Sequence, residues 1–281
     1  MNRETEGTLL AFLVLTLLGL EPVIIKSNPV NPLAFASLSA IFASLILWPL
    51  LLICGLVEEI RKSPGELKKA FLTGLFATAI AYSLFSYGTR MSTAINSAIL
   101  TRFEVFYSFL LSWLLLKERI TGRTVISAVA LIGGVFLVVA QGKRLELLKG
   151  DVLLLLTPLF WQLGHSIAKR TAYSPLTIAT LRNTFGGLVL LVPALLAGFA
   201  FTKLALAEGV VIALTQSLWY SAIARINLSK ATAILTPAPA LTVLISTLFL
   251  GEGFTPYHLA GLTLITAGTI ILSGEKSGVR E

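Results

Sequence analysis

The sequence predicts an all-α membrane protein with ten transmembrane helices, arranged as two five-helix repeats of inverted topology with both the N- and the C-terminus in the cytoplasm. Three observations support this prediction: the composition, an internal repeat, and the placement of Lys and Arg. Hydrophobic residues make up 56% of the chain and charged residues only 13%, and the mean hydropathy is +0.87. Soluble domains carry about 25% charged residues, so this composition predicts a multi-pass protein of the cell (plasma) membrane.

An internal repeat divides the chain into residues 1–144 and 145–281. Several residues of the first half match residues of the second at a constant spacing, and one four-residue segment recurs at a slightly different spacing. The matches are Gly7 with Gly150, Lys26 with Lys169, Pro32 with Pro175, Phe42 with Phe185, and Ala98-Ile99-Leu100-Thr101 with Ala233-Ile234-Leu235-Thr236. We therefore expect each half to form one five-helix unit.

Ten apolar segments are long enough to cross a bilayer as helices. Their predicted ranges are 7–26, 32–57, 70–89, 92–116, 121–140, 150–170, 175–200, 205–224, 229–250 and 257–274. Because each half holds five spans, an odd number, the two halves enter the membrane in opposite senses. The longest loop, 58–69, is rich in charged residues, so we expect it to form a solvated turn.

The placement of Lys and Arg supports cytoplasmic termini. If the N-terminus is inside, the inner segments hold most of the 22 Lys and Arg. The outer segments then hold Lys26, Arg90, Lys143, Arg144, Lys149 and Lys203. This asymmetry is the positive-inside pattern and explains the net charge of +8. Nucleic-acid binding is not expected, because no basic face with interleaved aromatic residues lies outside the spans.

The fourth predicted span carries two charges about halfway along, where charges are costly. On a helical wheel, Glu104 shares a polar stripe with Ser97, Thr101, Ser108 and Ser112, whereas Arg102 lies on another side. The two charges therefore need partners elsewhere. Glu104 either lines a substrate path or forms a structural ion pair with an Arg of another helix. Arg102 either anchors a substrate carboxylate or neutralises Glu21 or Glu104.

Other polar and aromatic residues are candidates for the wall of a cavity. Glu21 lies in the outer third of the first span. Its side chain either serves as an outer gate or ion-pair partner, or extends to the membrane surface. The aromatic candidates could equally form interfacial belts, and a lone His is more often a packing group. The remaining candidates are Tyr82 and Ser86 in the third span, Trp161, Gln162 and His165 in the sixth, and Gln216, Trp219 and Tyr220 in the eighth.

Proline and small residues predict where helices bend or approach closely. Pro237 and Pro239 fall near mid-membrane in the ninth span, where they should bend the helix or expose carbonyls to a cavity. Small residues mark tight packing in the fifth and tenth spans, either within the subunit or between the two copies of a homodimer. These small residues are Ala130, Gly134, Gly261 and Gly268.

The chain resembles the drug/metabolite transporter superfamily, specifically its EamA-type ten-helix permeases. The resemblance covers essentially the whole chain. It rests on the five-plus-five pattern, the helix of Trp161 that ends in Lys169, the Pro-Leu turns that open the second and seventh spans, and Gly251-Glu252 after the ninth. The family exports amino acids and other small metabolites. The resemblance implies a central cavity among spans one, three, four, six, eight and nine.

These observations predict a secondary active transporter, working as an exporter of small polar metabolites by alternating access. Amino acids fit best, because the cavity candidates include both acids and bases; the alternatives are export of cationic drugs or other metabolites, and an intramembrane lipid-modifying enzyme or a receptor. No catalytic, metal-ligand or phosphate-loop pattern occurs, so neither enzyme activity nor a cofactor is expected. The expected partners are the bilayer, a small-molecule substrate and possible coupling protons, with Glu104 coupling either protons or ligand charge to the alternation.

Overall fold

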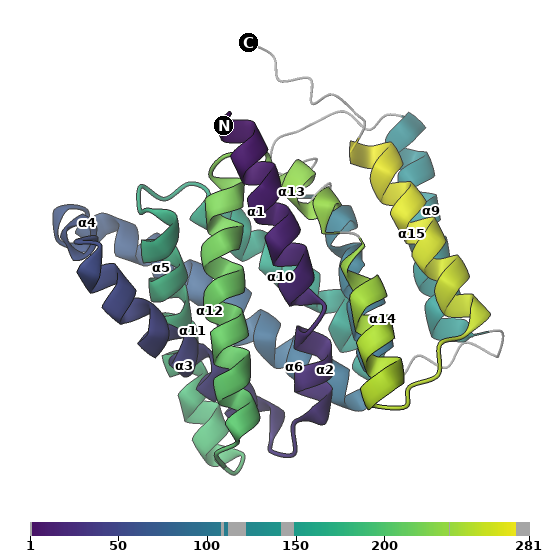
Figure 1. Cartoon of the computed structure of the whole chain (residues 1–281), viewed down its shortest axis with the longest axis horizontal. Coiled ribbons are helices and arrows are strands. Elements are labelled where there is room, and N and C mark those ends of the chain that lie inside the picture. Colours follow the sequence, from purple (N-terminus) through teal and green to yellow (C-terminus); the bar gives the residue numbers. More distant parts are fainter. Residues whose placement is uncertain (1, 108–109, 112–121, 142–148, 236, 274–281) are drawn as a thin grey trace.

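The computed structural model describes residues 2–107, 110–111, 122–141, 149–235 and 237–273. The regular elements of this part of the chain are helices (Figure 1). Ser108, Ser112, Lys143, Arg144 and Thr236, which the sequence analysis singled out, lie outside it.

The helices of the first half follow the predicted ranges, with interruptions. They are α1 (Arg3–Leu18), α2 (Glu21–Ser27), α3 (Pro32–Ile53), α4 (Val57–Lys62), α5 (Leu67–Gly74), a π-helical stretch (Leu75–Ile80), α6 (Ala81–Met91), α7 (Ala94–Leu100), a 3₁₀ turn (Thr101–Phe103) and α9 (Gly122–Ala140). The second predicted span therefore ends near Ile53 rather than at 57, and a short helix, α4, follows it.

The second half has longer uninterrupted helices. They are α10 (Lys149–Ala168), α11 (Pro175–Leu196), α12 (Lys203–Ile223), α13 (Leu228–Ile234), α14 (Ala238–Phe249) and α15 (Pro256–Ser273). Among the described residues, five helical segments are long and apolar enough to cross a membrane: Arg3–Ser27, Pro32–Ile53, Pro64–Met91, Pro175–Leu196 and Lys203–Ile223. The total of ten crossings and the cytoplasmic side of the termini stay predictions.

Two predicted spans are broken near their middles next to proline. The first span ends as α1 at Leu18 and restarts as α2, whose first turn contains Pro22. The ninth stops at Ile234 and restarts as α14, with Pro237 at the N-cap and Pro239 in the first turn. A proline ring clashes with the carbonyl of the residue four positions earlier, so the first turn is the position of a helix that accommodates it best.

The prediction of a continuous helix over 92–116 is wrong at Thr101–Phe103, which form a 3₁₀ turn before helical geometry resumes at 104–107. The hydroxyl of Thr101 donates to the carbonyls of Ser97 (2.7 Å) and Ala98 (3.2 Å). A hydroxyl that binds the preceding turn in this way competes with the backbone ladder and favours a local change of pitch.

The first helices of the two halves run antiparallel. The start of α1 lies at the end of α12, where Glu6 pairs with Arg225 (3.0 Å), and Lys26 at the other end of α2 donates to the carbonyl of Ser92. In α10 the order is reversed. Its start lies at the end of α6, where Asp151 accepts from the Ser92 hydroxyl (2.5 Å), and Lys169 just beyond its end donates to the carbonyl of Ile226 (3.2 Å).

Helices α9 and α15 pack side by side at one edge of the molecule (Figure 1). The predicted small residues lie in this contact. A Cβ atom on Gly134 would lie 2.7 Å from the carbonyl oxygen of Gly261, and one on Gly268 would lie 3.2 Å from the Cβ of Ala130. These small residues therefore serve packing within the subunit, and they give no support to a homodimer.

Candidate functional site

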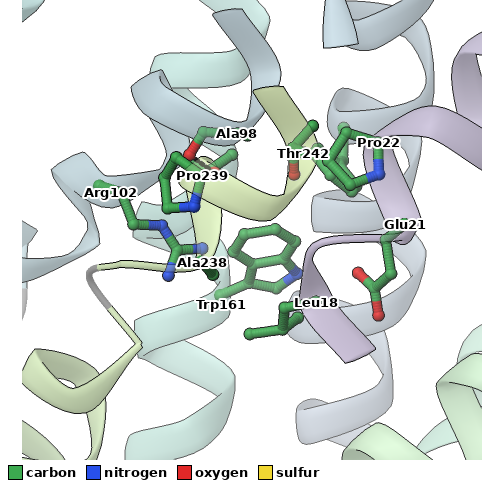
Figure 2. A pocket seen from close by; sticks show the side chains of 11 residues that line it. Leu18, Glu21, Pro22, Ala98, Arg102, Trp161, Ala238, Pro239 and Thr242 are labelled. Carbon is green, nitrogen blue, oxygen red and sulfur yellow. Dashed lines mark hydrogen bonds between the residues drawn. The ribbon is translucent and has the colours of Figure 1, made fainter. Parts of the chain in front are cut away.

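A cavity of about 60 Å³ lies in the middle of the helix bundle. That space holds a few water molecules. Its lining residues come from both halves of the chain: Val14, Leu18, Glu21, Tyr82, Arg102, Glu104, Trp161, His165, Arg182, Thr215, Gln216, Trp219 and Leu235. A smaller pocket shares Leu18, Glu21, Arg102 and Trp161 with it and extends to Pro22, Ala98, Thr101, Pro239 and Thr242 (Figure 2).

The two proline-associated helix breaks meet beside these pockets. The hydroxyl of Thr242 on α14 donates to the carbonyl of Gly19 (2.9 Å), at the break between α1 and α2. Gly19 is needed for this approach, because a Cβ there would lie only 2.6 Å from the Cβ of Leu241. The breaks thus place Glu21, in the first turn of α2, next to the start of α14.

The break between α13 and α14 also receives Arg102. The Nη1 of Arg102 donates to the carbonyl oxygen of Leu235 (3.1 Å), and its buried Nε has no hydrogen-bond partner in the described part of the chain. Glu104 accepts a 2.6 Å hydrogen bond from the side-chain amide of Gln162. Figure 2 shows the indole of Trp161 between Arg102 and Glu21, so in this view the ring separates a cation from a carboxylate.

Sequence reasoning did not place Arg182 of α11 in the site. Its guanidinium is buried and lines the cavity while donating to Thr78 Oγ1 (2.8 Å), Tyr220 Oη (3.0 Å) and the carbonyl of Ala77 (2.7 Å). It therefore holds α11, α12 and the π-helical stretch together. An Arg inside an apolar predicted span is the sequence signal that identifies such a residue.

Sequence reasoning also missed Glu208 of α12. This side chain is fully buried and accepts a 2.7 Å hydrogen bond from the hydroxyl of Tyr82. Tyr82 lines the cavity and Glu208 lies behind it, outside the lining.

Several buried polar atoms of the cavity wall have no partner among the residues that the structure describes. They are Arg102 Nε, His165 Nδ1, Thr215 Oγ1 and Trp219 Nε1. Buried polar groups are normally hydrogen-bonded, so atoms of this kind mark places where water or a polar ligand binds. The cavity wall is therefore suited to a polar occupant rather than to an apolar one.

The structure brings most of the predicted site residues together. Glu21, Tyr82, Arg102, Glu104, Trp161, His165, Gln216 and Trp219 line the larger cavity, and Thr101 and Pro239 line the smaller pocket. Gln162 binds Glu104, and Tyr220 binds Arg182. Two predicted residues do not reach the lining: the Ser97 hydroxyl donates to the carbonyl of Thr93, and Ser86 is buried elsewhere. Glu21 is only 5% exposed, so its extension to the membrane surface is wrong.

A polar network joins the two halves at the far ends of α2 and α6. Glu252, which follows α14, accepts hydrogen bonds from the backbone amides of Ala94 (2.8 Å) and Ile95 (3.0 Å) at the start of α7. Asn96 of α7 contacts both Asp151 (3.2 Å) and His258 (3.0 Å). The described residues contain no group of three or more His, Cys, Asp or Glu side chains suited to a metal ion.

Comparisons with known proteins agree with this architecture. The model of the EamA-like transporter family matches residues 5–140 and again 148–274. An uncharacterised protein of Pseudomonas aeruginosa is 27% identical over 260 residues, which cover 88% of this chain and 86% of the relative.

An uncharacterised transporter of Archaeoglobus fulgidus is 27% identical over 90% of this chain and 80% of its own, and one of Bacillus subtilis is 24% identical over 80% of each. A solved crystal structure superposes with a TM-score of 0.70 at 14% identity, covering 96% of this chain and 97% of that one, which shows a shared fold. With a family model that spans both halves and apolar helices long enough to cross the bilayer, this multi-pass membrane protein belongs to the EamA-like transporter family.

Proposed function

We propose that this transporter moves a small zwitterionic metabolite, with amino acids as the best-fitting class, by secondary active transport with alternating access. The observation that carries the proposal is that cationic and anionic side chains line the same cavity. Arg102, with an unpartnered Nε, and Arg182 line the cavity together with Glu21 and Glu104. A molecule that carries both an ammonium and a carboxylate group complements this arrangement.

The substrate's carboxylate would bind at Arg102, and its ammonium group at Glu21 or Glu104. Guanidinium groups bind carboxylates through two parallel hydrogen bonds, and the free Nε leaves such a donor at Arg102. We assign Glu104 to ligand charge, because it already accepts from Gln162 and lies in the electrostatic field of Arg102. The unpartnered Trp219 Nε1 supplies a further donor, and His165 Nδ1 supplies a donor or an acceptor, depending on its tautomer.

Alternating access requires the cavity to widen, because its present volume admits only a few water molecules. The two helix breaks supply the bending points. Leu235 and Gly19 carry carbonyls outside the regular helical ladder, and each already has a side-chain donor. A broken helix moves its two parts independently while its polar backbone groups stay satisfied.

The inverted repeat and cytoplasmic termini belong to the same proposal. The antiparallel course of α1–α2 and α10 supports inversion, and the first turn of α1 and the last turn of α15 lie at the same end of the molecule (Figure 1). The loop charges support the cytoplasmic side. Export is the direction that we propose for the cell.

Export of cationic drugs is the second candidate function. The observation in its favour is the gathering of carboxyl groups, since Glu21 and Glu104 line the cavity and Glu208 lies just behind it. The two Arg side chains on the same wall oppose a purely cationic ligand by like-charge repulsion.

A flux assay in proteoliposomes tests the proposal. Purified protein would be presented with labelled neutral amino acids, cationic drugs and sugars in parallel, and protein-free liposomes would serve as the control. We expect saturable flux of amino acids that unlabelled amino acids inhibit. Flux restricted to cations would favour the second candidate, and flux restricted to uncharged sugars would contradict both.

A further inference from the structure

The buried Glu208 has fewer compensating partners than Glu104, a carboxyl group of the cavity wall. Both side-chain oxygens are shielded from solvent, Oε1 accepts from Tyr82 (2.7 Å), and no described residue forms a hydrogen bond with Oε2. Among the described residues, no nitrogen of a cationic side chain lies within the 4.0 Å that defines an ion pair with either oxygen. Glu104 differs, because Gln162 donates to it and Arg102 interacts with it electrostatically.

The helices packed around α12 do not supply a cation to Glu208. Helix α12 packs on α1, α2, α3, α11 and α13, and α3 carries no ionisable side chain. The ionisable groups on these helices, on α12 itself and on nearby α6 are already engaged elsewhere or lie at helix ends. Near the cavity, Glu21 faces the lining, Tyr82 binds Glu208, and Arg182 binds Tyr220. Toward the helix ends, Lys26, Arg90 and Arg3 donate to backbone carbonyls, and Lys230 and Arg225 pair with Glu4 and Glu6. The remaining ionisable groups are Tyr87 of α6 and the exposed Lys203.

The charged side chain that interacts with Glu208 has the same sign as its carboxylate. Glu21 interacts with it electrostatically, so two carboxylates here would repel each other. A buried carboxylate with one neutral donor, no cation and a negative neighbour is far costlier than the neutral acid. A proton on Oε2, the oxygen without a partner, removes that cost.

From this geometry we infer that Glu208 is a proton-binding site of the transporter, connected to the central cavity through Tyr82 and Glu21. The Tyr82 ring lines the cavity, and its hydroxyl is the contact between the cavity wall and Glu208. When the cavity widens and water reaches Tyr82, the Oε2–H bond breaks, its electron pair stays on Glu208, and the proton passes to water or to the Glu21 carboxylate.

This inference rests on the proposed transport function and adds its coupling ion. The structure assigns different tasks to the two buried glutamates that differ most in their surroundings. Glu104, which is compensated by Gln162 and Arg102, serves ligand charge, whereas Glu208 carries the proton. The two assignments predict different infrared spectra for the variants: Glu208→Gln should lose the signal of the protonated acid, and Glu104→Gln should keep it.

Infrared difference spectroscopy of the full chain in lipid tests the proton site without a substrate. The carbonyl stretch of a protonated carboxylic acid is resolved from the bands of carboxylates. We expect absorption of this kind at neutral pH, with a component that disappears in Glu208→Gln and persists in Glu104→Gln and in the control Glu252→Gln, whose carboxylate binds backbone amides. A wild-type spectrum without the band, or a band unchanged in Glu208→Gln, would overturn the inference.

A second variant decides the question if Glu208→Gln does not fold. Tyr82→Phe removes the hydrogen bond to Oε1 and leaves the carboxyl group in place, so the band should remain and shift in frequency. An unshifted band in Tyr82→Phe contradicts the assignment.

Transport then separates this inference from the proposed substrate class. In proteoliposomes that carry a labelled amino acid, Glu208→Gln should reduce accumulation driven by a pH gradient to the protein-free level and retain exchange of amino acid for amino acid. If no amino acid is transported at all, the proposed substrate fails while the infrared result still decides the proton site. If Glu208→Gln accumulates amino acid as the wild type does, the coupling role fails.

Discussion

Three charged side chains at the cavity, Arg102, Arg182 and Glu104, are held by neutral groups rather than by one another. Arg102 donates to the carbonyl of Leu235, Arg182 to Thr78, Ala77 and Tyr220, and Glu104 accepts from Gln162. Each charge is thus oriented while part of its hydrogen-bonding capacity stays free. A ligand with complementary charges meets groups that need little rearrangement before they bind it.

Arg102→Lys should weaken substrate binding and leave the protein folded. Lys keeps the positive charge but presents a compact ammonium group instead of the planar fork. Losing one charge-assisted hydrogen bond costs about 1.5–3 kcal/mol, which corresponds to roughly ten- to hundredfold in affinity. The measurement is the KM for amino-acid flux in proteoliposomes.

The matched control for this substitution is Arg61→Lys, at an exposed Arg that pairs only with Glu58 among the described residues. It should leave KM unchanged. An unchanged KM in Arg102→Lys as well would show that the guanidinium serves the helix break and not the substrate.

At this scale, the sequence reveals a buried charge when it stands far along an apolar segment. Arg102 and Glu104 satisfy that condition, and both line the cavity. Glu208 does not, because it stands about one and a half turns from the start of α12, where a charge reads as interfacial. Its burial follows from the packing of α12 on α3, which no periodicity in the sequence indicates.

At the scale of elements, the interrupted helices set the shape of the cavity. The sequence predicts the ninth-span interruption through Pro237 and Pro239, since proline has a fixed effect on the backbone. It does not predict the 3₁₀ turn at Thr101–Phe103, which depends on where the Thr101 hydroxyl finds its acceptor. The π-helical stretch Leu75–Ile80, which presents its backbone to Arg182, likewise has no local signature.

Pro239→Ala should reduce transport without unfolding the protein. Pro239 lies in the first turn of α14 and lines the smaller pocket, so alanine removes the ring that keeps α14 separate from α13. The measurement is the initial rate of flux, with the elution profile in detergent as the check on folding. Pro49→Ala, in an exposed position of α3, is the control and should transport normally. Equal rates in the two variants would assign Pro239 to structure alone.

Gly134→Ala should destabilise the pair α9 and α15. The added Cβ would lie 2.7 Å from the Gly261 carbonyl oxygen and from Ile265, so the helices must move apart, at a cost of about 1–3 kcal/mol. The adjacent Gly133 provides the control, because its Cβ would meet only Leu264, at 3.8 Å. Alanine there should raise stability by up to about 1 kcal/mol.

Thermal unfolding of the purified variants in detergent measures this difference. The midpoint should fall for Gly134→Ala and stay level or rise for Gly133→Ala. A fall of equal size in both variants would mean that the close approach of the two helices is not what limits stability.

At the scale of the whole molecule, a labelling experiment tests the orientation in the membrane. The free and exposed Cys54 would first be replaced by Ser. In that background, Lys62→Cys in the predicted inner loop should react with a membrane-impermeant maleimide only after permeabilisation, and Lys203→Cys should react on intact cells. Reaction of Lys62→Cys on intact cells would refute the proposed topology.

The sequence predicts the all-helical, membrane-spanning character of the molecule. Helix ranges follow from apolar length, and the matched pairs Gly7 with Gly150 and Lys26 with Lys169 mark corresponding helices. Their mutual arrangement depends on contacts between distant segments, such as the Thr242 hydrogen bond to Gly19. A single sequence carries no direct record of such contacts, so the cavity wall could be predicted only in part.

The matched lysines have an energetic consequence for the direction of transport. Lys26 binds the backbone ahead of α7, Lys169 binds the backbone ahead of α13, and the helices that carry them run in opposite directions. If the Lys26 contact breaks while the Lys169 contact forms, or the reverse, one hydrogen bond from a lysine to a backbone carbonyl replaces another. Under the proposed alternating access, this exchange adds little to the free-energy difference between the two access states. Net flow follows the solute gradients, and reversing those gradients should make the same molecule run backwards.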